Sequence, residues 1–406
     1  MSIPSSKTVC LITSGQPATN PRLVKEADAL SQAGYEVTVV YAYWAAWAQE
    51  ADRLVLFDKK WKAVQVGGSP TQNKTLWYWT RFRHKLAQSF PFLHGIKLRA
   101  LCRPYDELLR AAKANKADLY IGHNLAALPV AVQAAKYHKS QSAFDIEDFH
   151  RAEEHQTDPR RQALKLLIET SYLPKVDALT AASPLIAENY QQLLPNLPRI
   201  RVILNTFPKA QQPTYRPTNE QALRLFWFSQ TIGADRGLED VLQAMERLPK
   251  IQLHLSLIGN VSEAVRWKLM DALGSPNHHI EFLGTVAPDK IFEIAAKQDV
   301  GLALERQTPF NRDICLTNKI FTYLLAGNAV LATATQAQQQ LLKAYPGIGE
   351  LYNHGDVETL AGHLENFAID RISLEQTRRT AWQLAHDELN WETEQRPLLQ
   401  MVQELL

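Results

Sequence analysis

The residues best placed to do chemistry lie in the stretch 300–331. A short apolar run, residues 300–304, is typical of a buried parallel strand, and a polar loop rich in Arg, Asn, Asp and Thr follows it. Residues 318–326 then predict a helix that Gly327 ends as a C-terminal cap. In open α/β sheets, ligands bind beyond the carboxyl ends of strands. The N–H groups of a helix that begins there favour anions, and Lys319 adds a charge that suits phosphate.

A second cation lies in the loop 229–237, between a predicted strand at 223–228 and a helix at 238–248. Arg236 precedes Gly237 at the start of that helix, and a guanidinium can hold phosphate through two hydrogen bonds. The alternative is a surface arginine, which the positive end of the helix dipole would disfavour. The second half of the chain therefore predicts an anion site.

In the first half, polar side chains again follow short apolar runs. The loop 14–22 follows a strand at 9–12, and Asn20 with the next proline predicts a helix start. His123 follows a strand at 118–122, so it either faces a ligand or caps the next helix. Residues 147–151 follow a strand at 142–146 and place two carboxylates beside a histidine. They either tune one another's pKa or form a salt-bridged loop.

Composition limits the class of protein. A chain of 406 residues with 46% hydrophobic and 21% charged residues predicts a globular protein of two or three domains. A net charge of +2 does not call for nucleic acid. Three widely spaced cysteines predict no disulfide framework and no zinc site, and they favour a reducing compartment. The polar N-terminus is unlike a signal peptide, and no apolar run approaches the length of a transmembrane helix.

The strand–loop–helix rhythm occurs in both halves and predicts two Rossmann-like α/β domains that face each other across a cleft. No G-x-G-x-x-G follows the first strand, which disfavours a dinucleotide-binding oxidoreductase. The proline-containing segment 208–219 is the predicted linker. We expect domains at 1–207 and 220–388 and a terminal amphipathic helix at 389–406.

Residues 59–105 contain ten Lys and Arg residues, interleaved with Trp, Tyr and Phe, and no acidic residue. This mixture suits an interfacial helix on anionic lipid, and it also suits single-stranded nucleic acid. A third possibility is an exposed basic helix pair whose aromatic side chains belong to the core. The residues expected to face a membrane are Trp77, Trp79, Arg81, Arg83 and Lys85.

Residues 318–327, Asn-Lys-Ile-Phe-Thr-Tyr-Leu-Leu-Ala-Gly, resemble the donor-binding segment N-K-x-F-E-Y-L-x-x-G of retaining glycosyltransferases of family 4, which have the GT-B fold. The loop 229–237 is similar to that family's phosphate loop, with Gln230 at the Arg position and Arg236 at the Lys position. Thr322 stands where the family has a ribose-binding Glu, and Ile314 stands at the place of the family's other Glu. Glu305 or Asp313 is the expected substitute.

The resemblance implies a metal-independent, hexosyltransferase-like enzyme without cofactor or covalent nucleophile. It would move a sugar from a nucleotide-diphosphate sugar to an acceptor hydroxyl, and the leaving phosphate would take the acceptor proton. The implied catalytic residues are His123, which contacts the sugar, and Arg236 and Lys319, which stabilise the leaving group. The implied donor-binding residues are Gly15, Ser229, Gln230, Gly259, Asn260, Leu283, Glu305, Asn318 and Thr322. The implied acceptor-binding residues are Asn20, Arg22, Asp148 and His150.

The same resemblance makes 1–207 the acceptor domain and 220–388 the donor domain, with 389–406 packing back on the former. The expected acceptor is a glycan or a lipid-linked glycan in bacterial polysaccharide, glycolipid or glycoprotein assembly, and nucleic acid is not expected as a partner. The expected location is the cytoplasm, including the inner face of the cell membrane.

Two alternatives remain open. A sugar-nucleotide epimerase shares the GT-B fold and would need acid–base carboxylates, which only Glu147, Asp148, Glu153 and Glu154 offer. A degenerate, non-catalytic GT-B subunit that binds a partner or membrane is favoured by the loss of both Glu residues of the motif.

Overall fold

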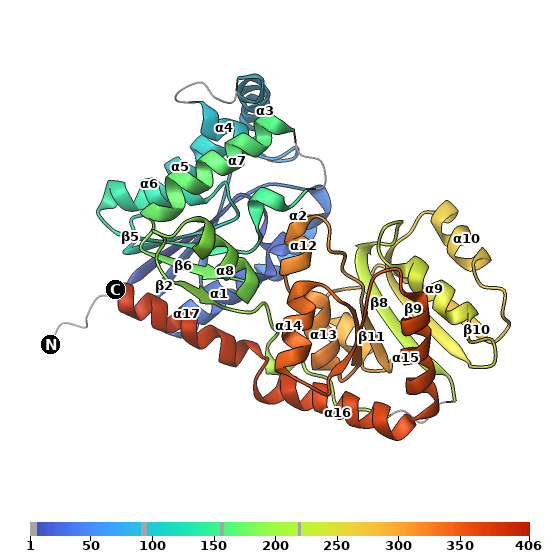
Figure 1. Cartoon of the computed structure of the whole chain (residues 1–406). Helices are drawn as coiled ribbons and strands as arrows, with labels where there is room; N and C mark the ends of the chain where they lie inside the picture. The colour runs from blue at the N-terminus through green and yellow to red at the C-terminus, as the bar shows by residue number, and fades with distance from the viewer. Residues whose placement is uncertain (1–5, 91–95, 155–157, 218–220) are drawn as a thin grey trace. The chain divides into compact units, whose positions relative to one another are not determined.

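The computed structural model describes residues 6–90, 96–154, 158–217 and 221–406, and it divides into two compact units (Figure 1). The first unit contains the chain up to Ile203 together with Gln395–Leu406, and the second contains Leu204–Glu394. Residues 91–95 of the basic segment and 218–219 of the predicted linker lie outside the described residues.

The first unit is built on a parallel sheet of seven strands in the order β3-β2-β1-β4-β5-β6-β7. Its inner strands are almost wholly buried, which is why they read as continuous apolar runs in the sequence. The strand order reverses between β1 and β4, the place where such sheets bind ligands. The strands are β1 (Thr8–Thr13), β2 (Glu36–Ala42), β3 (Lys62–Val66), β4 (Leu119–His123), β5 (Gln141–Ile146), β6 (Ala178–Ala181) and β7 (Ile200–Val202).

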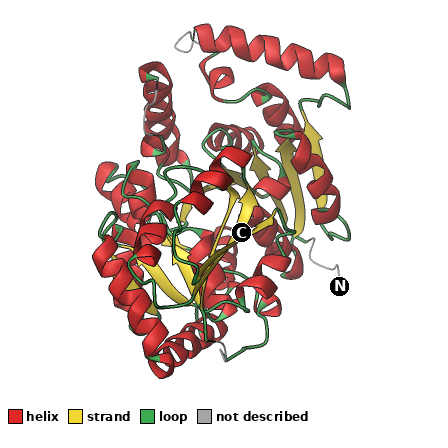
Figure 2. Ribbon diagram, turned by 90° about the vertical axis from the view of Figure 1, so that its right-hand side faces the viewer, coloured by secondary structure: helices red, strands yellow, loops and turns green. Residues whose placement is uncertain are grey.

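Helices pack around the strands, which are yellow in Figure 2. The predicted start of the first helix is confirmed, because the Asn20 side chain accepts a hydrogen bond from the Leu23 N–H at 3.0 Å and Pro21 follows it. The helices are α1 (Pro21–Gln32), α2 (Ala46–Val55), α3 (Lys74–Ser89), α4 (Lys97–Leu101), α5 (Tyr105–Ala114), α6 (Leu128–His138), α7 (Pro159–Tyr172), α8 (Pro184–Leu193) and α17 (Trp391–Leu405). Short 3-10 helices lie at Pro17–Thr19, His150–Ala152 and Leu173–Lys175.

The C-terminal part of α17 belongs to the first unit, and Arg201 forms an ion pair with Glu404 there. The predicted return of the last helix to the N-terminal domain is therefore confirmed. None of the helices in the described ranges is long and apolar enough to cross a membrane.

The second unit has a parallel sheet of six strands in the order β10-β9-β8-β11-β12-β13, which reverses between β8 and β11. The strands are β8 (Leu223–Thr231), β9 (Leu253–Asn260), β10 (His278–Gly284), β11 (Val300–Ala303), β12 (Ala329–Thr333) and β13 (Gly349–Tyr352). A 3-10 helix lies at Lys209–Gln211, and the helices are α9 (Leu238–Glu246), α10 (Glu263–Asp271), α11 (Lys290–Ala295), α12 (Phe310–Ile314), α13 (Asn318–Ala326), α14 (Gln336–Ala344), α15 (Val357–Ile369) and α16 (Arg371–Asp387).

Helix α13 packs directly on β11. A Cβ atom added to Gly301 would lie 2.1 Å from the Tyr323 ring, so only glycine permits this approach. The Tyr323 hydroxyl donates a hydrogen bond to the Leu302 carbonyl oxygen at 3.0 Å. Gly327 ends the helix at φ 75°, as the sequence predicts. These contacts fix the N-terminal turn of α13, with Asn318 and Lys319, relative to β11.

Candidate functional site

A network of buried charges lies at the carboxyl ends of β4 and β5 in the first unit. Arg22, from the first turn of α1, donates to both carboxylate oxygens of Asp145, from Nε at 2.6 Å and from Nη2 at 2.8 Å. Its third nitrogen donates to the Ile203 carbonyl oxygen at 2.6 Å. The Thr180 hydroxyl also donates to Asp145. Arg22, predicted as an acceptor contact, is thus buried in a bidentate ion pair.

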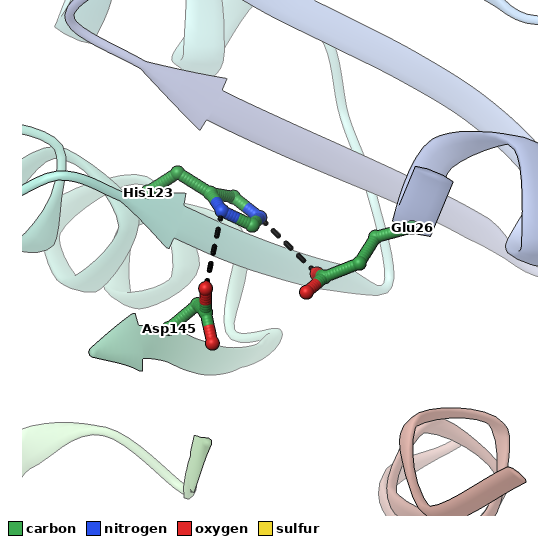
Figure 3. A group of neighbouring side chains, drawn as sticks. All are labelled: Glu26, His123 and Asp145. Atoms are coloured by element: carbon green, nitrogen blue, oxygen red, sulfur yellow. Dashed lines mark ion pairs between the residues drawn. The ribbon is translucent and has the colours of Figure 1, made fainter. Parts of the chain in front are cut away.

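His123, the last residue of β4, is fully buried between carboxylates (Figure 3). Its Nε2 lies 3.2 Å from Glu26, while its Nδ1 lies 3.1 Å from Glu147 and 3.6 Å from Asp145. Burial alone would lower the pKa of His123. Glu26, Glu147 and Asp145 outweigh that effect and raise the pKa to about 10, so the imidazole is protonated at neutral pH.

Glu26, His123 and Asp145 place their ligand atoms within 4.8 Å of one another, close enough to hold a metal ion. The chemistry of the donor set argues against that use. Arg22 already occupies both oxygens of Asp145, and a metal would need the neutral form of His123. Arg22 and His123 therefore pair with these carboxylates, and the arrangement is an ion-pair network.

Glu147 is the partly exposed member of the network, with 20% of its side chain accessible. Its Oε1 accepts hydrogen bonds from Asn20 Nδ2 at 2.7 Å and from His123. The structure therefore joins two residues predicted separately, Asn20 and His123, through a carboxylate. Gly15 lies in the turn after β1, where its N–H donates to the Thr13 hydroxyl.

The other predicted acceptor residues lie in the loop after β5. Asp148 is half-buried. His150 is buried and bonded through Nδ1 to Glu153, which also pairs with Lys165 at 2.8 Å. Burial would lower the pKa of His150, but Glu153 outweighs it and the pKa is raised. Glu153 and Glu154 both bind Lys165, so this part of the loop is salt-bridged.

We expect the free energy of unfolding to fall as the pH rises from 6.5 to 8.5. A pKa of about 10 in the folded state lies above the ordinary value of 6.5 for His123, so its contribution is complete below pH 6.5 and is lost as pH approaches 10. The slope should be on the order of 1 kcal/mol per pH unit, measured by urea unfolding. His123→Gln should reduce this slope, whereas His279→Gln, at an exposed site, should leave it unchanged. A flat wild-type profile would contradict a protonated His123.

In the second unit, the loop after β8 approaches the end of β11. A Cβ atom on Gly237, which has φ 79°, would lie 2.8 Å from the Leu304 Cβ. Asp235 and Arg306 tie the loop to the residues after β11 through an ion pair of 3.1 Å. Arg236 is half-buried and has no hydrogen bond or ion pair within the described ranges. It is the cation of this loop that remains available to an anion.

Lys319, in the first turn of α13, pairs with Glu305 at 2.7 Å, and the Thr317 hydroxyl donates to the same carboxylate oxygen at 3.1 Å. Burial would raise the pKa of Glu305, but Lys319 and Thr317 lower it, so the carboxylate is ionised. No hydrogen bond from the part of the chain that the structure describes reaches the other oxygen, Oε2. Asn318 accepts a hydrogen bond from Asn205 at 2.7 Å.

The structure distinguishes the two predicted substitutes for the missing Glu residues. Asp313 accepts hydrogen bonds from the Gln336 backbone and side chain at 2.9 and 2.6 Å, so both its oxygens are occupied. Glu305 keeps one oxygen open. Thr322 is buried, and its hydroxyl donates to the Asn318 carbonyl oxygen of its own helix at 2.9 Å. Ile314 is fully buried.

The remaining predicted donor residues lie at the carboxyl ends of β8, β9 and β10. The loop after β8 is joined to β9 by a hydrogen bond from the Ile232 N–H to the Asn260 carbonyl oxygen at 2.8 Å. A Cβ atom on Gly259 would lie 2.6 Å from the Ser229 carbonyl oxygen. Gln230 and Asn260 are exposed, and Ser229 and Leu283 are half-buried.

Sequence reasoning did not single out Glu26 or Asp145. Two signals were present. Asp145 is a charged residue inside a buried apolar strand, and Glu26 follows Arg22 by four residues, one helical turn. Arg306, which anchors the loop after β8, carried no distinguishing signal.

Residues 19–206 match the family model described as Glycosyl transferase 4-like domain. No curated protein sequence matches the chain. Sucrose-phosphate synthase from Thermosynechococcus elongatus has a similar structure, with a TM-score of 0.71 and 14% identity over 98% of this chain and 99% of that chain.

HepE from Anabaena, in complex with UDP and glucose, has a TM-score of 0.70 and 16% identity over 98% of this chain and 100% of that chain. An α,α-trehalose-phosphate synthase (UDP-forming) from Burkholderia vietnamiensis has a TM-score of 0.65 and 12% identity over 98% of this chain and 100% of that chain. At these identities the solved structures show a shared fold. The two parallel sheets and these likenesses confirm the predicted GT-B fold. The chain therefore has the GT-B fold, and its residues 19–206 match the glycosyl transferase 4-like domain family.

Proposed function

We propose that the protein is a retaining, metal-independent glycosyltransferase that uses a nucleotide-diphosphate sugar. The observation that carries this proposal is the pair of cations in the second unit. Arg236 is unpaired within the described ranges and precedes α9, and Lys319 lies in the first turn of α13. Cations and free N–H groups at helix N-termini stabilise the charge that develops on a leaving diphosphate. The UDP-sugar complexes among the similar structures support a nucleotide-sugar donor.

In this reaction the acceptor oxygen forms a bond to the anomeric carbon, and the bond from that carbon to the diphosphate breaks. The proton of the acceptor hydroxyl passes to the leaving diphosphate, and no covalent enzyme intermediate forms. We assign the hydroxyls of the donor ribose to Glu305, because Lys319 and Thr317 keep its carboxylate ionised while Oε2 remains open. The Lys319 ammonium group interacts with both the Glu305 carboxylate and the diphosphate.

In the first unit we assign recognition of the transferred sugar and the acceptor to Asn20, His123 and Glu147. His123 is buried with both ring nitrogens facing carboxylates, so it acts as a positioning residue. Its charge holds the Glu147 carboxylate, whose exposed part accepts hydrogen bonds from substrate hydroxyls. Asn20 holds the same carboxylate from the other side.

We further propose a glycan or lipid-linked glycan as the acceptor, in bacterial polysaccharide, glycolipid or glycoprotein assembly in the cytoplasm. The three cysteines are free thiols, and a reducing compartment suits them. The resemblance of the donor segment to family 4 supports the retaining outcome and the absence of a metal.

A thermal-shift screen against UDP, GDP, ADP, dTDP and CMP tests the proposal. A ligand present at about 100 times its dissociation constant should stabilise the protein by about 2.7 kcal/mol, so the matching diphosphate should raise Tm. Transfer from the corresponding sugar nucleotide should then yield a product with the donor's anomeric configuration. Conversion of the sugar nucleotide without acceptor would identify an epimerase. The absence of a shift with every nucleotide would support the non-catalytic subunit.

A further inference from the structure

The inner face of helix α3, which packs against the rest of the first unit, carries polar side chains. Thr80 is buried and accepts a hydrogen bond from Arg103 at 2.6 Å. Arg83 pairs with Asp106 at 2.9 Å and with Glu107 at 2.6 Å. The His84 ring bonds to the Arg99 carbonyl oxygen at 2.6 Å. The helix is therefore held mainly by hydrogen bonds and ion pairs on its inner face.

The outer face of α3 is apolar. Tyr78, Trp79, Phe82 and Leu86 each expose more than half of their surface. Positions 78, 82 and 86 recur every four residues, so they form one stripe along the helix, with Trp79 beside it. A surface helix of a globular protein normally shows the opposite arrangement. Such a stripe marks an interaction surface.

Cations border this stripe. Lys74, Arg81 and Lys85 are exposed, and none of them forms an ion pair within the described ranges. The Arg81 guanidinium lies 4.6 Å from the centre of the Trp77 ring, which is half-buried. Of the residues predicted to face a membrane, Trp79, Arg81 and Lys85 therefore point outward. Arg83 instead pairs with the acidic residues of α5.

Two further exposed tryptophans lie at the start of α2, in the same unit. Helices α2 and α3 follow the carboxyl ends of the neighbouring strands β2 and β3. Gln49 of α2 donates to the Thr71 hydroxyl at 3.3 Å, just before α3. Trp44 and Trp47 are each more than half exposed. Figure 1 shows α3 at the rim of the first unit, beside α4. The α2–α3 surface comprises Trp44, Trp47, Lys74, Tyr78, Trp79, Arg81, Phe82, Lys85 and Leu86.

We propose that the α2–α3 surface binds an anionic lipid surface. Its aromatic and leucine side chains enter the boundary between headgroups and acyl chains, and Lys74, Arg81 and Lys85 contact lipid phosphates. The uncompensated positive charge favours an anionic partner. The aliphatic Leu86 inside the stripe favours acyl chains over stacked bases, because only aromatic rings provide stacking platforms. The proposal goes beyond the transfer reaction, since it does not depend on the donor site.

Co-sedimentation of the full chain with vesicles tests this inference. Vesicles of phosphatidylcholine with about 30% phosphatidylglycerol should bind the protein, and phosphatidylcholine alone should bind it far more weakly. We expect Trp79→Ser/Phe82→Ser and Arg81→Glu/Lys85→Glu each to weaken binding at least about tenfold. Trp267→Ser replaces an exposed tryptophan on α10 of the second unit and should bind like the wild type.

Because the substituted side chains are exposed, these variants should unfold at the wild-type temperature and keep the nucleotide-dependent shift. That shift separates failure of this inference from failure of the donor assignment. The inference is overturned if anionic vesicles do not bind the protein, or if both double variants bind them as the wild type does. It is also overturned if the wild type binds a single-stranded oligonucleotide instead of vesicles, or forms a dimer that Trp79→Ser/Phe82→Ser dissociates.

Discussion

Replacing Arg236 with alanine is expected to lower kcat about 10²- to 10³-fold, because the leaving diphosphate loses a positioned cation at the moment its charge develops. Arg236 is half-buried and makes no hydrogen bond or ion pair within the described ranges, so its removal breaks no polar contact among those residues. The thermal stability of the unliganded protein should therefore stay unchanged. The rise in Tm with the matching nucleoside diphosphate should be lost.

Steady-state transfer kinetics and thermal shifts measure these effects. Arg236→Lys keeps the charge without the bidentate geometry and should lie between the wild type and Arg236→Ala. Lys268→Ala removes an exposed lysine of α10 in the same unit and should have no effect. Lys319→Ala is a less direct probe, because it also leaves Glu305 without its partner. Wild-type kinetics in Arg236→Ala would refute the assignment of this residue to the diphosphate.

Much of the architecture could be predicted from sequence because the inner parallel strands are buried on both faces. The strands β1 and β11 therefore read as uninterrupted apolar runs. Local capping chemistry added helix ends, as at Asn20 and Gly327, because a cap depends only on neighbouring residues. Boundaries of this kind do not require knowledge of long-range contacts.

The site was less accessible, because its contacts join residues far apart in the chain. Sequence placed Arg22 after a strand, but the bond that buries it involves Asp145, more than a hundred residues later. The choice between Glu305 and Asp313 depended on Lys319 and Gln336, which periodicity does not reveal. The orientation of α3 could not be predicted from the sequence either. Its inner face is set by Asp106 and Glu107 of α5, which pair with Arg83.

Arg22→Met is expected to destabilise the first unit by about 3–5 kcal/mol. The substitution leaves the carboxylate of Asp145 buried without its bidentate partner, and it removes a nearby cation from Glu26 at 3.5 Å. Arg201→Met is the matched control. Its ion pair with Glu404 is partly exposed, so the loss should be only about 0–1 kcal/mol. Hydrogen exchange of the β5 amides reports this unit specifically and should show the difference.

The destabilisation should also depend on pH in a defined direction. In the wild type, burial would raise the pKa of Asp145, but Arg22 outweighs it and the pKa is lowered. Without Arg22, burial dominates and the pKa rises above its ordinary value. The carboxylate then becomes neutral as pH falls. The free energy of unfolding that Arg22→Met loses relative to the wild type should therefore be largest near pH 7 and smaller under acidic conditions. Asp145→Asn in the Arg22→Met background should recover part of the loss at pH 7 for the same reason. If Arg22→Met is as mild as Arg201→Met, then the network does not stabilise the fold, and Arg22 is free to serve substrate binding as the sequence predicted.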